Sequence, residues 1–268
     1  MICVLRIIAF SCTITLLAGC NGTEKDVPIW EHVKISDLAT AHTAEHPGSQ
    51  SLKTINFDVY IFELPVENIG ALDGIWRTLY TKPLRFNDYD AFCANSFSVG
   101  FGQLPIWNEI ADLLRTAGAK KAETVTLLLS DGLANDIAIA GLADEQTIFY
   151  ISTAGSMEGA TVGPGTVALR IKAEKIPGAR GVCNVHLVPV SLPLRKTSLT
   201  QANASIKSGE FHFTSAGFRL KMGPGDFFLF GPGKYINNQI TLGGSLFNKP
   251  GRKPAVRVFM FICTGIND

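Results

Sequence analysis

The sequence lacks the short motifs that mark many enzymes and metalloproteins. It has no Cys-x-x-Cys pair, no His-Glu-x-x-His helix and no Gly-x-Ser-x-Gly elbow, which argues against thioredoxin-like, zinc-binding and α/β-hydrolase sites. Lys234 follows Gly231-Pro232-Gly233. However, Phe228 occupies the position where a phosphate-binding loop needs its first glycine. We therefore expect no catalytic residues, no metal ligands and no cofactor.

An excess of charge of either sign is also missing. The chain has 24 Lys and Arg against 23 Asp and Glu, with no basic run. This composition predicts no nucleic-acid partner and no polybasic attachment to anionic lipid. Aromatic residues are mostly phenylalanine, 17 of them against three Trp and five Tyr, which favours a β-rich, well-filled interior.

No apolar run is long enough to cross a bilayer, which takes about 20 residues. The longest run covers residues 7–17, directly after Arg6, and small residues follow it. A positive charge, an apolar run of roughly 7–15 residues and a small-residue cleavage site are typical of a secretory signal peptide.

The end of this segment, Leu17-Ala18-Gly19-Cys20, resembles the lipobox of bacterial lipoprotein precursors. The resemblance implies cleavage between Gly19 and Cys20, transfer of a diacylglyceryl group to the Cys20 thiol, and acylation of the new amino group. The partner of this cysteine is then a membrane, held through the lipid anchor. Asn21, in place of aspartate, favours the outer membrane facing the periplasm. An ordinary signal peptide cleaved near Ala18 is the alternative.

Three regions follow from these patterns. Residues 1–19 are the expected signal peptide, and residues 20–53, polar and interrupted by Pro and Gly, are an expected flexible tether. Residues 54–268 are the expected globular domain, with a candidate subdivision near residue 121.

Hydrophobic periodicity predicts an α+β fold in two parts. A strand over 55–61, a helix over 69–79 capped by Asn68, a strand over 97–101 and a helix over 106–114 make a small strand-helix-strand-helix layer. After residue 121, about nine short strands indicate a sandwich or barrel-like layer.

Of six cysteines, Cys3 and Cys12 lie in the expected signal peptide and Cys20 is the expected lipidation site, so three remain for the fold, namely Cys93, Cys183 and Cys263. An oxidising compartment allows one disulfide and one free thiol. Cys183 and Cys263 are the candidate pair because both lie in expected core strands. The alternative is three buried thiols that act as small apolar side chains.

A catalytic site assembled from distant segments stays open as a second hypothesis, a periplasmic hydrolase. Ser130, Asp131 and His186 are residues of suitable type, since triads are defined by geometry and not by order. His186 and His212 are expected on the polar faces of strands. Glu63 and Glu67 flank Pro65 and are expected at a solvated strand end.

Near the C-terminus, Leu242-Gly243-Gly244-Ser245-Leu246-Phe247 and the strand up to Ile266 resemble the closing segment of secretin channels. The resemblance implies a secretin-like β-domain and assembly into rings.

Four phenylalanines, Phe228, Phe230, Phe259 and Phe261, alternate with other apolar residues. Their strands are therefore expected to be buried on both faces or to present an interaction face. The leading hypothesis is a non-catalytic, lipid-anchored envelope protein whose β-rich domain binds an envelope protein or copies of itself.

Overall fold

A computed structural model describes residues 53–194 and 209–267. The described residues all belong to one compact unit. Gly19, Cys20 and all of the expected tether except Lys53 lie outside them. No helix in the described ranges combines the length and hydropathy needed to cross a membrane.

The helices are short, and most of the chain is extended. The helical segments are η1 (Val66–Ala71), α4 (Leu72–Thr78), α5 (Tyr89–Ala94), η2 (Leu104–Ile106), α6 (Trp107–Thr116), η3 (Thr214–Ala216) and α7 (Leu242–Phe247). The strands are β1 (Thr54–Pro65), β2 (Arg85–Phe86), β3 (Phe97–Gln103), β4 (Lys120–Ser130), β5 (Ala134–Leu142), β6 (Gln146–Ile151), β7 (Met157–Val162), β8 (Gly165–Lys175), β9 (Cys183–Pro193), β10 (Phe211–His212), β11 (Phe218–Met222), β12 (Asp226–Pro232), β13 (Asn248–Lys249) and β14 (Ala255–Ile266).

The first sheet joins strands from both ends of the domain. Its order is β3-β12-β14-β1-β4, with β13 beside β14, and every pairing is antiparallel. In the register, Val59 lies opposite Phe261 on one side and Val125 on the other. The α+β class is confirmed. Periodicity did not predict that β1 and β3 share a sheet with the C-terminal strands.

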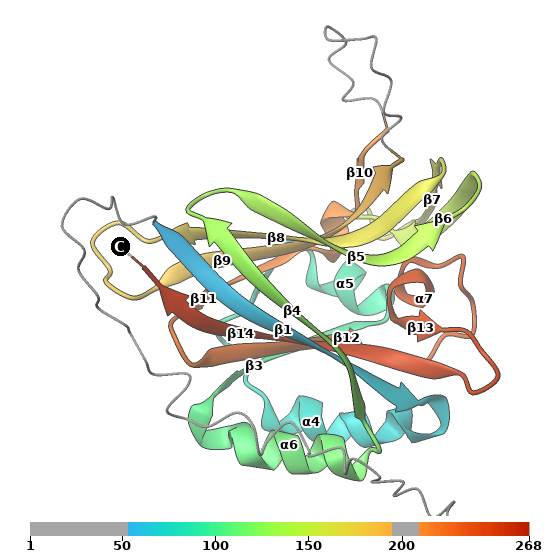
Figure 1. Cartoon of the computed structure of the whole chain (residues 1–268). Helices are drawn as coiled ribbons and strands as arrows, with labels where there is room; N and C mark the ends of the chain where they lie inside the picture. Colours follow the sequence, from blue (N-terminus) through green and yellow to red (C-terminus); the bar gives the residue numbers. More distant parts are fainter. Residues whose placement is uncertain (1–52, 195–208, 268) are drawn as a thin grey trace, which may run out of the picture. The chain divides into compact units, whose positions relative to one another are not determined.

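The second sheet has the order β2-β11-β9-β8-β5, with β10 beside β9. Figure 1 shows it packed over one face of the first sheet, while α4 and α6 cover the opposite face. The β6–β7 hairpin extends from one end. One hydrophobic cluster fills the space between the sheets and includes residues from both sides of position 121.

Phenylalanines dominate this core. Phe228 and Phe261 stack with ring centroids 4.5 Å apart, and Phe228, Phe230, Phe259 and Phe261 have no exposed surface. Leu229 and Met260, which point to the other face of the same strands, are equally buried. The expectation of double burial is confirmed, and these strands present no interaction face.

One local expectation, the helix cap at Asn68, is wrong. Asn68 does not cap a helix: it lies inside η1, and its side-chain amide donates to the Ala117 carbonyl at 3.0 Å. The segment Leu242–Phe247 is a buried helical turn, α7, in which Thr241 Oγ1 accepts from the Gly244 amide at 3.1 Å.

Candidate functional site

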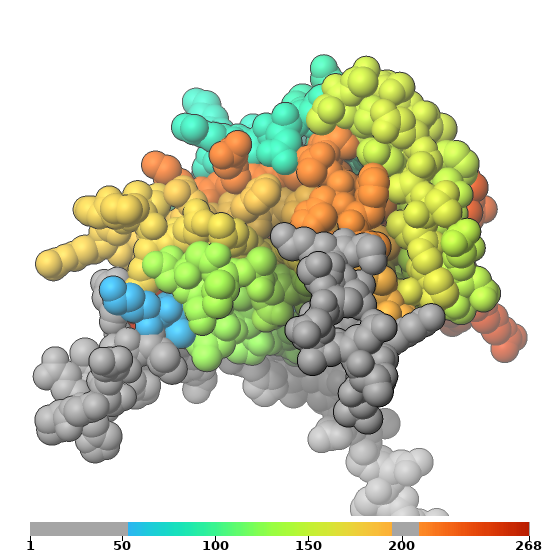
Figure 2. All heavy atoms as spheres, turned by 90° about the horizontal axis from the view of Figure 1, so that it is seen from above, coloured from blue at the N-terminus to red at the C-terminus, as the bar shows by residue number. Residues whose placement is uncertain are grey.

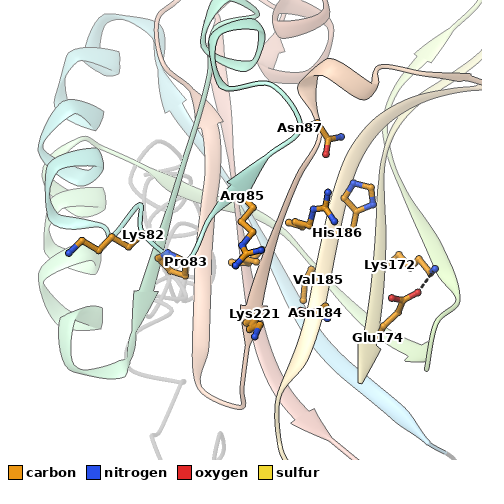
Figure 3. A pocket seen from close by; sticks show the side chains of 12 residues that line it. Lys82, Pro83, Arg85, Asn87, Lys172, Glu174, Asn184, Val185, His186 and Lys221 are labelled. Carbon is orange, nitrogen blue, oxygen red and sulfur yellow. Dashed lines mark ion pairs between the residues drawn. The ribbon is translucent and has the colours of Figure 1, made fainter. Parts of the chain in front are cut away.

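A concave, strongly basic surface lies on the outer face of the second sheet. Its volume is about 650 Å³, within the range typical of small-molecule sites. We call it the basic groove. It is lined by Lys82, Pro83, Arg85, Asn87, Lys172, Glu174, Asn184, Val185, His186, Arg219, Leu220 and Lys221. Figure 3 shows these side chains, and in Figure 2 the elements that carry them, β8 and β9 in yellow and β11 in orange, lie on the face seen from above.

Strand alternation directs these side chains outward. Val185 and Leu220 are buried in the core, so their neighbours His186 and Arg219 point to the opposite face. The ladder register then aligns four basic residues across four strands. Lys172 on β8 lies opposite His186 on β9, His186 opposite Arg219 on β11, and Arg219 opposite Arg85 on β2.

This basic row is about 14 Å long, because neighbouring strands are about 4.8 Å apart. A second row next to it runs from Glu174 through Asn184 to Lys221. Like charges directly opposite one another in a ladder destabilise the pair. The fold therefore holds Arg85 and Arg219 at a repulsive position that a bound anion would relieve.

Acidic side chains do not balance this charge. Glu174 is the one carboxylate in the lining, and it forms an ion pair with Lys172. Within residues 53–194 and 209–267, no ion pair involves Lys82, Arg85, Arg219 or Lys221.

Arg170, two residues before Lys172 on β8, differs from the cations of the groove because acidic side chains neutralise it. Its Nε and second guanidinium nitrogen donate to the two Asp136 oxygens at 2.6 and 2.7 Å, and it also pairs with Glu210. His212 lies 2.6 Å from the same Glu210 carboxylate. The positive charge of Arg170 is thus neutralised within the protein, whereas that of the groove faces outward.

His186 lies at the centre of the basic row and is half-buried. Burial lowers the pKa of this imidazole below 6.5, and the charges of Arg219 and Lys172 lower it further, while Glu174 opposes them. The neutral ring has one N–H donor and one acceptor nitrogen. Together with the guanidinium and ammonium groups, it makes the groove a surface rich in donors for an anion.

The residues predicted for dispersed catalysis make separate contacts. Asp131 Oδ1 accepts from the Lys175 amide at 2.8 Å, Ser130 pairs with Thr54 at the end of β4, and His186 faces the groove. Glu63 accepts from Lys249 Nζ at 2.7 and 2.8 Å. The part of the chain that is described contains no group of three or more His, Cys, Asp or Glu placed to hold a metal ion.

Cys183 and Cys263 lie together between the two sheets, although both are free thiols here. The neighbouring Cys183 thiol, together with burial, raises the pKa of Cys263. Cys93 is exposed. The structure brings together the two cysteines selected from the sequence, and the disulfide between them stays a prediction.

Sequence reasoning missed the groove because its charges come from four strands and one loop. The alternation of Arg219 and Lys221 with buried residues, and of Lys172 with Ile171 and Ala173, does mark solvated strand faces. Nothing in the sequence gives the register that places these faces side by side. The near-zero net charge of the whole chain gave no indication of the local excess of positive charge in the groove.

No protein-family model matches the chain, and no curated protein matches it. Among solved structures, the InvG secretin-domain β-barrel from the Salmonella SPI-1 injectisome is similar over 81% of this chain, with 13% identity and a TM-score of 0.24. The type IV competence pilus secretin PilQ of V. cholerae is similar over 79%, with 11% identity and a TM-score of 0.22. The aligned region spans 64% and 60% of those chains. This resemblance to secretin domains is weak and carries no conclusion about assembly.

Proposed function

We propose that this chain is a lipid-anchored envelope protein, attached to the membrane through Cys20, whose β-rich domain is a non-catalytic binding module for an anionic partner. The observation that supports binding is the row of Lys172, His186, Arg219 and Arg85 on one face of the second sheet. The lipobox supports the anchor.

The chemistry of the groove suits reversible binding. Guanidinium groups have N–H donors in a fixed fork that matches oxyanions, and such charge-assisted hydrogen bonds are about twice as strong as neutral ones. The outward-facing Lys82 and Lys221 add positive charge that attracts an anion over distances of about one Debye length, roughly 8–10 Å. Binding is therefore expected to weaken as the salt concentration rises.

Equilibrium binding of the lipid-free Cys20→Ser protein to polyglutamate and to tripolyphosphate tests the binding module. In the double variant Arg85→Gln/Arg219→Gln, at least one of these polyanions should bind about 100-fold more weakly, because two charge-assisted contacts are lost. Arg252→Gln, in an exposed turn outside the groove, is the matched control and should bind like the parent. If neither polyanion binds the parent protein, the proposal is wrong.

The anchor is tested separately by metabolic labelling with a palmitate analogue. Wild type should carry the label and fractionate with membranes, and Cys20→Ala should do neither. An unlabelled wild-type protein contradicts the anchor without affecting the groove.

A second candidate function is assembly with copies of the same chain, favoured by the edge strand β4. Among the described residues, β4 pairs with β1 on one side and with no strand on the other. Charged residues protect its first half. Residues 124–130, Thr-Val-Thr-Leu-Leu-Leu-Ser, have no charge and high β-propensity, and Leu128 is 63% exposed. An open edge of this kind is a template for pairing with another strand.

Analytical ultracentrifugation of the Cys20→Ser protein tests this second candidate. The parent should associate with increasing concentration, and Leu128→Lys should shift it towards monomer because the added charge opposes edge pairing. Leu133→Lys, equally exposed in the turn after β4, is the control. A parent protein that stays monomeric at all concentrations excludes assembly through this edge.

A further inference from the structure

We propose that the ligand of the basic groove carries two neighbouring phosphate groups, as a diphosphate or a bisphosphate. This inference rests on the proposed function, since it names the chemical class of the anion that the groove binds.

The charge density of the groove matches two phosphates. Four cations of the groove, Lys82, Arg85, Arg219 and Lys221, have no ion-pair partner among the described residues, and the groove holds about 650 Å³. A phosphate monoester carries a charge of about −1.5 to −2 near neutral pH. Two phosphates therefore balance the four cations within a small-molecule volume, whereas carboxylates would have to number about four.

The spacing of the donors also matches phosphate. Arg85 and Arg219 lie directly opposite each other on neighbouring strands, which are about 4.8 Å apart. Two guanidinium forks at this separation offer up to ten N–H donors in a small space. A tetrahedral phosphate has enough oxygens to accept from both forks, while a single carboxylate has two. This pair is the expected site of the first phosphate.

The other half of the row provides the place for the second phosphate. Figure 3 shows His186 and Lys172 on the adjacent strands, with Lys172 joined to Glu174. The next row adds Asn184, an uncharged donor, and Lys221. Lys172 can turn from Glu174 to a ligand without leaving a buried charge, because both side chains are 41% or more exposed. A ligand across His186 thus contacts both halves of the row.

The groups that face His186 make binding sensitive to protons. Arg219 and Lys221 on β11, Lys172 and Glu174 on β8, and Arg85 on β2 surround it. In the free protein, the pKa of His186 is held down by burial and by the neighbouring cations. An anion beside the ring favours the imidazolium. Binding of a diphosphate should therefore take up a proton, and affinity should rise as the pH falls through the pKa of His186 in the complex.

The experiment is isothermal titration of the full Cys20→Ser protein with pyrophosphate, orthophosphate and malonate, in two buffers of different ionisation enthalpy. Pyrophosphate should bind about 10-fold or more tightly than either of the other two, since it makes at least one more charge-assisted contact. Arg85→Gln and Arg219→Gln should each weaken pyrophosphate about 10-fold or more. Arg252→Gln should have no effect. His186→Asn should take up fewer protons on binding than the parent, since the protons that pyrophosphate itself exchanges are common to both proteins, and circular dichroism confirms that each variant is folded.

The outcomes separate this inference from the proposed function. If polyglutamate binds in the groove and pyrophosphate does not, the inference of a diphosphate ligand is wrong, while the proposed binding module is still supported. Binding of neither overturns both. A DNA oligonucleotide that binds more tightly than pyrophosphate would also overturn the diphosphate, since the groove would then follow a polymer backbone. Equal affinities for malonate and pyrophosphate would also show that the inference of a diphosphate ligand is wrong.

Vesicles distinguish two sources of the same chemistry. Sedimentation with vesicles that contain diacylglycerol diphosphate, against vesicles with phosphatidate (one phosphate) and with phosphatidylcholine alone, tests a membrane headgroup as the ligand. Vesicle binding that pyrophosphate displaces supports a lipid source. Pyrophosphate binding without vesicle binding supports a soluble one.

Discussion

Two basic residues on strand β8, Arg170 and Lys172, differ in what their positive charges contact. Arg170 and Lys172 on β8 both point to the outer face of the second sheet. Asp136 and Glu210 hold the Arg170 guanidinium and keep its pKa above the ordinary value. Lys172 lies two residues further on, in a row with His186, Arg219 and Arg85. The first charge serves the fold, and we assign the second to a ligand.

The pKa of His186 leads to a prediction about stability. Because burial, Arg219 and Lys172 hold the folded-state pKa below 6.5, the unfolded chain takes up this proton first as the pH falls. The neutral His186 ring therefore contributes to the free energy of unfolding. This contribution is fully present above about pH 6.5 and is lost as the pH falls from there towards the lower folded-state pKa. Urea denaturation at about pH 7.5 and about pH 5.5 should show a smaller loss of unfolding free energy in His186→Gln than in the parent. Equal losses in the two proteins would contradict the assignment.

The two buried thiols lead to a second prediction at this scale. Refolding in the presence of a disulfide-containing oxidant should form a disulfide bond between Cys183 and Cys263. Both thiol protons are released, and two electrons reduce the disulfide of the oxidant. The cross-link closes a loop of about 80 residues and should raise the unfolding free energy by about 2–5 kcal/mol. Thiol titration of the denatured Cys20→Ser protein, prepared as residues 20–268 so that Cys3 and Cys12 are absent, should then find one thiol, Cys93, and Cys93→Ser should have none. Three titratable thiols after refolding would show that the pair stays reduced.

At the scale of elements, the two adjacent glycines of α7 have a structural cause in close backbone packing. Gly243 and Gly244 follow Thr241 and Leu242 in a six-residue helix with no exposed face. A Cβ on Gly244 would lie 1.8 Å from the Asn238 carbonyl oxygen, and one on Gly243 would lie 2.6 Å from that of Asn95. The two glycines therefore let other backbone segments approach the helix closely.

Substitution of one of these glycines gives the prediction for this element. Gly244→Ala should lower the unfolding free energy by about 3 kcal/mol, the upper end of the usual cost of overpacking, because the contact is with backbone that cannot turn away. Gly251→Ala is the control, since nothing lies within 4 Å of that position, and it should change stability by less than about 0.5 kcal/mol. Chemical denaturation measures both. A Gly244→Ala protein as stable as the control would mean that this backbone contact is loose.

Most elements could be predicted from periodicity, because each depends on its own residues. The alternation at Val59 and Ile61 predicts β1, and the spacing of Ile110 and Leu114 predicts α6. Asn68 misled us, since its amide bonds Ala117, far along the chain, and not its own helix. The short strand β2 exists through its pairing with β11 and carries no signal of its own. The basic groove depends on that pairing, and so it could not be predicted.

At the scale of the whole molecule, a nearly neutral chain separates its charges by location. The 24 basic and 23 acidic residues leave a net charge of only +1, while the outer face of the second sheet has five Lys and Arg beside one Glu. The Phe-rich strands β12 and β14 of the first sheet are buried on both faces. The proposed binding of an anionic partner uses the polar side of the second sheet.

The most direct test of the binding module is a residue-resolved NMR titration of the Cys20→Ser protein with tripolyphosphate and with polyglutamate. A binding site in the basic groove predicts saturable shifts for at least one of them, concentrated at Arg85, Lys172, His186 and Arg219, and absent from the Arg85→Gln/Arg219→Gln variant. Shifts that never saturate, or that centre on another face of the domain, would contradict it.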